Sequence, residues 1–221
     1  MSASLHIFDL DNTLIDGDSS TWWSEYLVRE GLVDDARYLA REAALMEDYA
    51  HGSMDLHQYV ALTLSPLAAM TIPEVDARVA RWVDDVILPR VYPQARELIQ
   101  TLNAQGQPTL VISASVSLLV KPIARALGIN EAIGVEVRTR DNRYSNCISG
   151  TPSYQQGKIT RFNAWRETQA AAPETVTFYT DSINDLPLCL QADKVVLVNP
   201  CPQLRAQGEA RQWPAVSWSL A

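Results

Sequence analysis

The stretch Leu5-His6-Ile7-Phe8-Asp9-Leu10-Asp11-Asn12-Thr13-Leu14 decides the fold. A mostly apolar run leads directly into two aspartates one residue apart, which is typical of a buried strand that ends at the carboxyl edge of a parallel sheet. Open α/β sheets bind their ligands at that edge. Two neighbouring carboxylates repel each other, so the pattern favours a divalent cation between them. Taken alone, the stretch also fits a strand followed by an Asx turn.

The composition of the chain excludes several classes of protein. Its 221 residues, 47% of them hydrophobic, are enough for one domain with an insertion. The net charge of -8, without a cluster of Lys or Arg, argues against nucleic acid or an anionic membrane as a partner. No apolar run is long enough for a membrane span, and no signal peptide fits ahead of the first strand. The three cysteines are odd in number and lack metal-ligand spacing, so we expect reduced thiols in a cytoplasmic protein. We expect a monomer or a homodimer, a choice that the sequence leaves open.

Residues 17–88 are predicted to form a helical domain inserted after the first strand. Apolar side chains recur at helical spacing in four segments, of which the second ends near Gly52, the third is disturbed at Pro66 and the fourth begins at Pro73. An insertion at this point lies over the carboxyl edge of the sheet, where it acts as a lid. Four acidic side chains of the insertion are expected to be solvated: Glu42, Glu47, Asp48 and Asp55.

The remaining residues, 1–16 and 89–221, are predicted to form the core domain. Apolar strands are predicted at 108–112, 133–137, 176–179 and 195–198, the last being the final strand, with a hairpin at 142–148 and helices at about 93–105, 116–127, 157–168 and 186–191. The predicted fold class is therefore α/β: a Rossmann-like parallel sheet with right-handed crossovers and an all-helical cap after the first strand.

Polar side chains follow three of these strands and begin one helix. They are Asp9 and Asp11 after the first strand, Ser113 after the strand 108–112, Asp181, Asn184 and Asp185 after the strand 176–179, and Lys158 at a helix start; Ala114, next to Ser113, offers its backbone N–H. The carboxyl ends of parallel strands meet in one crevice, so we expect these groups to lie together. Each has a simpler reading by itself: Ser113 as a helix cap, Lys158 as a solvated side chain, and 181–185 as an Asx turn.

Together these groups suit phosphoryl transfer. A carboxylate can attack phosphorus to form an aspartyl-phosphate, and Mg²⁺ held by carboxylates shields the two anions from each other. Lys158 and the Ser113 hydroxyl can hold the phosphoryl oxygens, assisted by backbone N–H groups. A second carboxylate must protonate the leaving alkoxide and later activate water, and Asp11 is placed for that role.

With these residues the whole chain resembles the haloacid dehalogenase superfamily, in its phosphoserine-phosphatase-like branch with a helical cap. The segment 9–13 resembles the first motif, DxDxT, Ser113 the second, Lys158 the third, and the pair Asp181 and Asp185 the fourth.

The resemblance implies a role for each motif residue. Asp9 is the implied nucleophile and Asp11 the implied general acid and base. Mg²⁺ is implied to bind Asp9, Asp181 and the backbone carbonyl of Asp11, with Asp185 oriented behind them and Asn184 beside it. The insertion corresponds to the cap that closes over the substrate.

The resemblance also bears on the substrate. Phosphoserine phosphatases place an acidic residue nine positions after the nucleophile, near the substrate amine, and Asp18 has that spacing here. They also use a cap arginine for the substrate carboxylate. This chain has no Lys or Arg between Arg41 and Arg78, and Thr63 falls near that position. A carboxylate without a cationic partner binds poorly in a closed cap. We therefore expect an ester that carries an amine and no carboxylate, and histidinol phosphate fits because similar enzymes include histidinol-phosphatases.

Other substrates and other functions remain open at this point. Phosphocholine or phosphoethanolamine also fits, with Trp22, Trp23 or Trp82 as a cation–π wall, and phosphoserine is a further alternative. Outside the phosphatases, the alternatives are a phosphomutase and a phospho-acceptor switch module. A receiver module carries its acceptor on a middle strand of a shorter chain without a cap, and Asp11 would hydrolyse the adduct that such a switch preserves.

Overall fold

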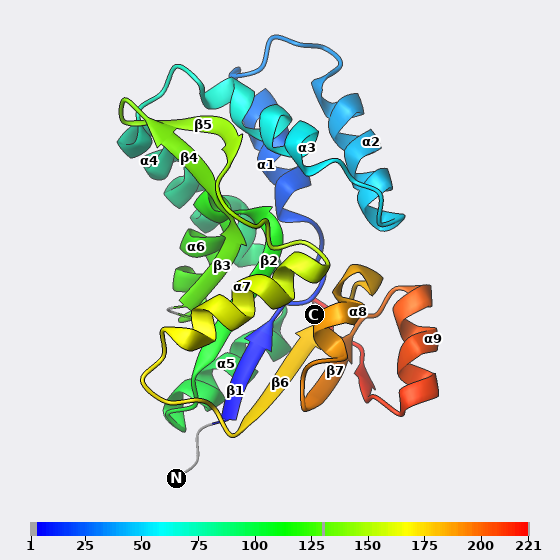
Figure 1. Cartoon of the computed structure of the whole chain (residues 1–221). Helices are drawn as coiled ribbons and strands as arrows, with labels where there is room; N and C mark the ends of the chain where they lie inside the picture. The colour runs from blue at the N-terminus through cyan, green and yellow to red at the C-terminus, as the bar shows by residue number, and fades with distance from the viewer. Residues whose placement is uncertain (1–3, 130, 221) are drawn as a thin grey trace.

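A six-stranded, entirely parallel sheet forms the core of the computed structural model, which describes residues 4–129 and 131–220 (Figure 1). Its strands are β1 (Ser4–Phe8), β2 (Thr109–Val116), β3 (Glu131–Val135), β6 (Thr175–Thr180), β7 (Lys194–Val198) and β8 (Ala215–Val216). They are ordered β3-β2-β1-β6-β7-β8, which places the first strand of the chain in the middle of the sheet. The α/β class with a Rossmann-like parallel sheet is thereby confirmed.

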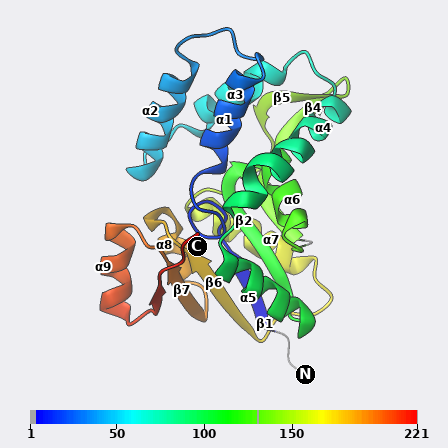
Figure 2. The same cartoon turned by 180° about the vertical axis from the view of Figure 1, so that it is seen from behind.

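Helices cover the two faces of the sheet and divide its core in two. Helices α5 (Pro93–Ala104) and α6 (Ser117–Ala126) lie on one face, and α7 (Gln156–Glu167), α8 (Leu186–Cys189) and α9 (Pro202–Arg211) lie on the other (Figures 1 and 2). Side chains of β1 alternate between the two cores: Leu5 and Ile7 pack towards α7–α9, and Phe8 packs towards α5 and α6. Because β1 is buried on both faces, its sequence is a nearly continuous apolar run.

Four helices lie beyond the carboxyl ends of β1, β2 and β6: α1 (Ser19–Arg29), α2 (Tyr38–Ala50), α3 (Leu56–Leu64) and α4 (Ile72–Trp82) (Figure 1). Local sequence fixes their ends. Asp18 and Asp55 accept backbone N–H bonds as the N-caps of α1 and α3, and Thr71 begins α4 in a capping box with Glu74. A short 3₁₀ turn at Ser65–Leu67 follows α3 at the proline that was predicted to disturb it. No helix among the described residues is long and apolar enough to cross a bilayer.

Two passages of chain join these helices to the sheet, and they lie side by side. Ile15 bridges Val91, the Asp16 N–H donates to the Arg90 carbonyl at 2.8 Å, and the Tyr92 hydroxyl donates to Asp16 at 2.9 Å. The arrangement supports our proposal of a core of 1–16 and 89–221 and a cap of 17–88, although residues 1–3, 130 and 221 of that core lie outside the described residues.

A β-hairpin from the core part of the sequence packs on the cap. It consists of β4 (Val137–Arg140) and β5 (Arg143–Ile148), as the predicted hairpin required, and β5 packs against α3. The Asn142 carbonyl accepts the Ile72 N–H at 2.8 Å, and the Tyr144 hydroxyl donates to Asp76 of α4 at 3.0 Å. The hairpin therefore supports the cap helices from the side.

Two sequence predictions about the sheet are wrong. The second strand does not end at residue 112, because residues 113–116 remain extended and fully buried in β2. The strand β7 is not the last, because α9 and β8 follow it. Helix α9 buries only Leu204 and Gly208, so its apolar periodicity is weak, and β8 has just two residues.

Trp82 provides a test of packing in the cap. Its ring is fully buried and meets Trp23 edge-on, with ring centroids 5.2 Å apart. We expect Trp82→Ala to lower the free energy of unfolding by roughly 3–5 kcal/mol, because the cavity left behind cannot collapse completely. Urea denaturation followed by circular dichroism measures this loss. Leu190→Ala, at a side chain that is 58% exposed, is the control and should change stability by less than about 0.5 kcal/mol. Equal losses in the two variants would contradict the packing described.

Candidate active site

The candidate site lies at the carboxyl end of β1, between β2 and β6. Phe8 pairs with Val111 of β2 and Tyr179 of β6, and the Asp9 N–H donates to the Tyr179 carbonyl at 2.9 Å. The two aspartates after β1 therefore have the serines of β2 on one side and the Asp181 loop on the other. The sequence expectation that these strand ends converge is met by the geometry.

Lys158 lies between two buried carboxylates. Its Nζ is 2.7 Å from Asp9 Oδ1 and 2.6 Å from Asp185 Oδ1, and its side chain is 1% exposed. Burial alone would lower the pKa of Lys158, but the charges of Asp185 and Asp9 outweigh it and raise that pKa. The lysine therefore stays charged. Lys158 is in the first turn of α7. The residue before it, Gly157, has no room for a side chain, because an added Cβ would meet the Pro152 carbonyl oxygen.

The Asp9 carboxylate is destabilised as an anion. Its pKa is raised to about 7, chiefly by burial and also by repulsion from Asp185 and Asp11, while Lys158 opposes the shift. Burial, followed by repulsion from Asp9 and Asp185, also raises the pKa of Asp181 well above its usual range. The cluster thus carries more negative charge than its one lysine neutralises.

Threonines hold the other carboxylates of the cluster in place. Thr13, the last residue of the DxDNT run, donates its hydroxyl to Asp181 Oδ1 at 3.1 Å. Thr180, the last residue of β6, donates to Asp185 Oδ2 at 2.7 Å. Asn12, between the aspartates and Thr13, has a left-handed backbone with φ of 54°, which Asn tolerates better than most residues.

Asp11 is held at both carboxylate oxygens. The Ser19 N–H donates to Oδ1 at 2.7 Å, the Ser115 hydroxyl donates to Oδ2 at 3.0 Å, and Ser113 makes a longer contact of 3.4 Å with Oδ2. Burial raises the pKa of Asp11 to about 7, with the charge of Asp18 adding to it, while bonds from Ser19 and Ser115 oppose the shift. A carboxyl group with a pKa near neutrality suits both the donation and the acceptance of a proton.

The donor set fits a Mg²⁺ ion. Oxygen ligands from Asp9, Asp181 and the Asp11 backbone are the type that Mg²⁺ prefers. Burial, with repulsion from neighbouring aspartates added to it, raises the pKa values of Asp9 and Asp181, and a divalent cation would stabilise the charged forms of both groups. Within residues 4–129 and 131–220, no group of three His, Cys, Asp or Glu side chains is placed to hold a cation by itself.

Asp18 lies at the entrance to the cap helices, close to Asp11. It caps α1 by accepting the Thr21 N–H at 2.9 Å, and burial raises its pKa to about 6, with Glu42 adding to the shift and Thr21 opposing it. Glu42 itself was expected to be solvated, and this is wrong. Its side chain, on α2, is buried and accepts the Thr21 hydroxyl at 2.7 Å.

A cavity of about 20 Å³ separates the cap from the aspartates, and its lining includes Asp11, Asp18, Tyr49 and Tyr59. In this arrangement of the helices the volume holds about one water molecule and is too small for an organic ester. The end of α2 is fastened to the core here, because Asn184 donates its side-chain N–H to the Tyr49 carbonyl at 2.8 Å.

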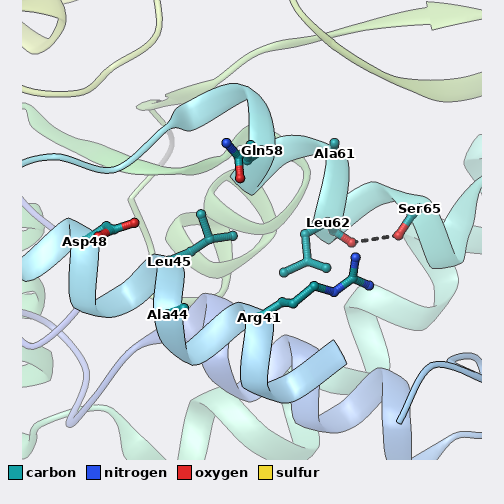
Figure 3. A pocket seen from close by; sticks show the side chains of 8 residues that line it. All are labelled: Arg41, Ala44, Leu45, Asp48, Gln58, Ala61, Leu62 and Ser65. Atoms are coloured by element: carbon teal, nitrogen blue, oxygen red, sulfur yellow. Dashed lines mark hydrogen bonds between the residues drawn. The ribbon is translucent and has the colours of Figure 1, made fainter. Parts of the chain in front are cut away.

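A larger cavity of about 430 Å³ lies within the cap and contains none of the predicted site residues. Figure 3 shows Arg41, Leu45 and Asp48 of α2 facing Gln58, Ala61 and Leu62 of α3 across it. Size therefore does not identify the active site in this structure.

The tryptophans proposed as cation–π walls do not line the small cavity. Trp23 and Trp82 are completely buried against each other, and Trp22 stacks on the Arg90 guanidinium at 4.9 Å. That expectation is wrong, because the tryptophans form the packing core and boundary of the cap. The aromatic rings at the cavity are instead Tyr49 and Tyr59.

Sequence reasoning missed several polar residues at the site. Thr13, Ser19, Ser115 and Tyr59 were assigned no role, although each hydrogen bonds within the site. Thr13 belongs to the DxDNT run and Ser115 follows Ser113 by two residues, so their positions gave a signal. Nothing in the sequence distinguished Tyr59 from the other aromatic residues of the cap helices.

Known proteins resemble the chain over nearly its full length. The family model of haloacid dehalogenase-like hydrolases matches residues 7–189. A histidinol-phosphatase of Neisseria meningitidis serogroup C (strain 8013) is 37% identical, and the match covers 97% of this chain and 99% of that protein. The crystal structure of a protein of unknown function from Bordetella pertussis Tohama I has a TM-score of 0.89 and 34% identity, covering 98% of this chain and 99% of the other. A substrate-bound phosphoserine phosphatase shares the fold, with a TM-score of 0.69 at 17% identity, covering 98% of this chain and 93% of that one.

Lys158 provides a test of the buried charge cluster. We expect Lys158→Met to lower the free energy of unfolding by roughly 3–5 kcal/mol at neutral pH in a chelator, because Asp9 and Asp185 lose their buried cationic partner. Urea denaturation measures the loss.

The matched control is Lys121→Met. Lys121 pairs with Glu136 at 2.7 Å, but its side chain is 50% exposed, so its loss should change stability by at most about 1 kcal/mol. A Lys158→Met protein as stable as the control would show that the lysine does not hold the cluster together.

Proposed function

The chain belongs to the haloacid dehalogenase-like hydrolase family, and within it we propose a Mg²⁺-dependent phosphatase that hydrolyses a small phosphate monoester through an aspartyl-phosphate on Asp9. Histidinol phosphate is the substrate we favour. The observation that carries the proposal is the arrangement at the end of β1, where Asp9 is paired with Lys158 at 2.7 Å and Asp11 is held two residues away.

The first half-reaction transfers the phosphoryl group to the enzyme. An Asp9 carboxylate oxygen attacks phosphorus, the bond from phosphorus to the ester oxygen breaks, and Asp11 gives its proton to the departing alkoxide. The pKa of about 7 at Asp11 keeps part of this group protonated at neutral pH. Its bonds from Ser19 and Ser115 fix the direction in which the proton is delivered.

The second half-reaction releases phosphate. Asp11, now a carboxylate, takes a proton from water, the water oxygen attacks phosphorus, and the bond to Asp9 breaks. The products are the alcohol and inorganic phosphate, and both aspartates return to their starting state. A cap closed over the substrate would limit the access of other water during transfer.

The phosphoryl oxygens need positive partners during both steps. We assign them to Lys158, the Ser113 hydroxyl and the backbone N–H at Ala114, all at the carboxyl edge of the sheet. Asp9, Asp181 and the Asp11 carbonyl would hold Mg²⁺, with Asp185 and Asn184 behind them. When bound, the ion neutralises the charge that accumulates between nucleophile and phosphate.

The lining of the cavity supports an amine-bearing substrate. It contains Asp11 and Asp18 and no Lys or Arg, so an ammonium group is favoured there and a carboxylate is not. Thr63, near the expected place of a carboxylate-binding arginine, is buried and donates its hydroxyl to the Tyr59 carbonyl. The neisserial relative is named a histidinol-phosphatase, which supports that amine-bearing ester over phosphoserine. The three cysteines are free, which supports the expected cytoplasmic setting.

Phosphate release from a panel of esters tests the proposed reaction. We expect turnover to require Mg²⁺ and to fall by at least about a thousandfold in Asp9→Asn, because the amide cannot act as the nucleophile. Among histidinol phosphate, phosphoethanolamine, phosphocholine, phosphoserine and sugar phosphates, kcat/KM should be highest for histidinol phosphate. It should exceed that for phosphoserine at least about tenfold. Undiminished turnover in Asp9→Asn would contradict the mechanism, and a preference for phosphoserine would contradict the choice of substrate.

Asp18→Asn tests the proposed amine contact. Asn also caps helices, so the change removes charge and preserves the start of α1. We expect KM for histidinol phosphate to rise about tenfold, and KM for p-nitrophenyl phosphate, which has no amine, to stay the same. Asp55→Asn is the matched control, since Asp55 caps α3 at an exposed position. An equal rise in KM for both esters would show that Asp18 does not bind the substrate amine.

A further inference from the structure

A row of hydroxyl groups connects a cap helix to Asp11. The Tyr59 hydroxyl is 2.7 Å from the Ser20 hydroxyl, which is 3.2 Å from that of Ser115, and Ser115 donates to Asp11 Oδ2 at 3.0 Å. The four residues come from four places in the chain: α3, the first turn of α1, β2 and the loop after β1. The row therefore crosses from the cap to the core.

The row is shielded from bulk water. Tyr59, Ser20 and Ser115 are 3%, 4% and 5% exposed, so a lost hydroxyl would not be replaced freely by solvent. Burial raises the pKa of Tyr59, which keeps its hydroxyl protonated and able to donate. The alternative contacts are longer: the Ser19 hydroxyl lies 3.4 Å from Ser115, and Ser113 lies 3.4 Å from Asp11.

The hydrogen bonds have only one consistent direction when Asp11 is a carboxylate. A carboxylate accepts and cannot donate, so Ser115 uses its single proton on Asp11. Ser115 then accepts from Ser20, and Ser20 accepts from Tyr59. Tyr59 is the outermost donor of the row, and removing its hydroxyl leaves Ser20 free to turn away from Ser115.

We propose that Tyr59 is a positioning residue that, acting through Ser20 and Ser115, holds the Asp11 carboxyl group in the orientation from which it delivers its proton to the leaving group. The inference rests on the proposed function, in which Asp11 is the general acid. Because Tyr59 belongs to the cap, the row is complete only when α3 lies over the site, and it links the alignment of Asp11 to a closed cap.

The test compares two leaving groups. An alkoxide needs a proton as it leaves, whereas p-nitrophenolate does not, and kcat/KM reports the first phosphoryl transfer. The esters are p-nitrophenyl phosphate and the alkyl ester that the wild-type enzyme hydrolyses fastest. We expect Tyr59→Phe to lower kcat/KM for the alkyl ester roughly fivefold to tenfold and for p-nitrophenyl phosphate by less than about twofold.

A double-mutant cycle tests the path of the effect. If Tyr59 acts through Ser115, then Tyr59→Phe combined with Ser115→Ala should be no slower than Ser115→Ala alone. Ser20→Ala breaks the row at its middle and should reproduce Tyr59→Phe. The matched control is Tyr38→Phe: Tyr38 is another buried tyrosine of the cap, but it donates to the Leu62 carbonyl and should change neither ester.

Three outcomes would overturn the inference: equal losses for both esters, effects of Tyr59→Phe and Ser115→Ala that multiply in the double variant, or a Tyr38→Phe protein as impaired as Tyr59→Phe. Thermal unfolding of each variant verifies its fold. Failure of the proposed function is seen separately, as a wild-type enzyme without turnover or an Asp9→Asn enzyme that keeps it.

Discussion

The buried contact of Lys158 with Asp9 and Asp185 is the interaction on which the rest of the site depends. It joins the central strand, the loop after β6 and the start of α7, three segments far apart in sequence, at distances of 2.7 and 2.6 Å. Such a cluster is costly to bury unless its charges are balanced. One lysine does not balance three aspartates, and burial together with repulsion between neighbouring aspartates raises the pKa values of Asp9 and Asp181. The same excess makes the site receptive to a divalent cation and to a phosphoryl group held by cations.

The cap supplies the second part of the site. Its helices bring Asp18 and the hydroxyl of Tyr59 to Asp11 and leave a cavity of about 20 Å³ beneath them. The side-by-side passages at Ile15 and Val91 give the cap a narrow connection to the sheet. Residues of the cap and residues of the core contact the same Asp11 carboxylate. A movement of the cap would therefore also change how Asp11 is held.

The features predicted best from the sequence are those that depend on a short segment of chain. Asp9, Asp11, Ser113 and Asp181 follow apolar strands directly, so strand ends and carboxylate chemistry sufficed to place them together. The sequence could not predict contacts between the cap and the core, because the orientation of α3 brings the Tyr59 hydroxyl to the serines that contact Asp11. Side-chain burial within the cap was predictable only in part. The helical spacing of Trp23 and Trp82 indicates the packing that they show, whereas Glu42 reads as a surface acid but is buried with Thr21.

The proposed mechanism requires Asp9 to accept the phosphoryl group, and trapping the intermediate tests this requirement most directly. Asp11→Asn should accumulate it from p-nitrophenyl phosphate and Mg²⁺, because that leaving group needs no proton while hydrolysis of the intermediate needs a base. After acid quenching, mass spectrometry should find one phosphoryl group on the peptide that contains Asp9. A phosphoryl group on another residue, or no adduct although the wild-type enzyme hydrolyses the same ester, would contradict the account.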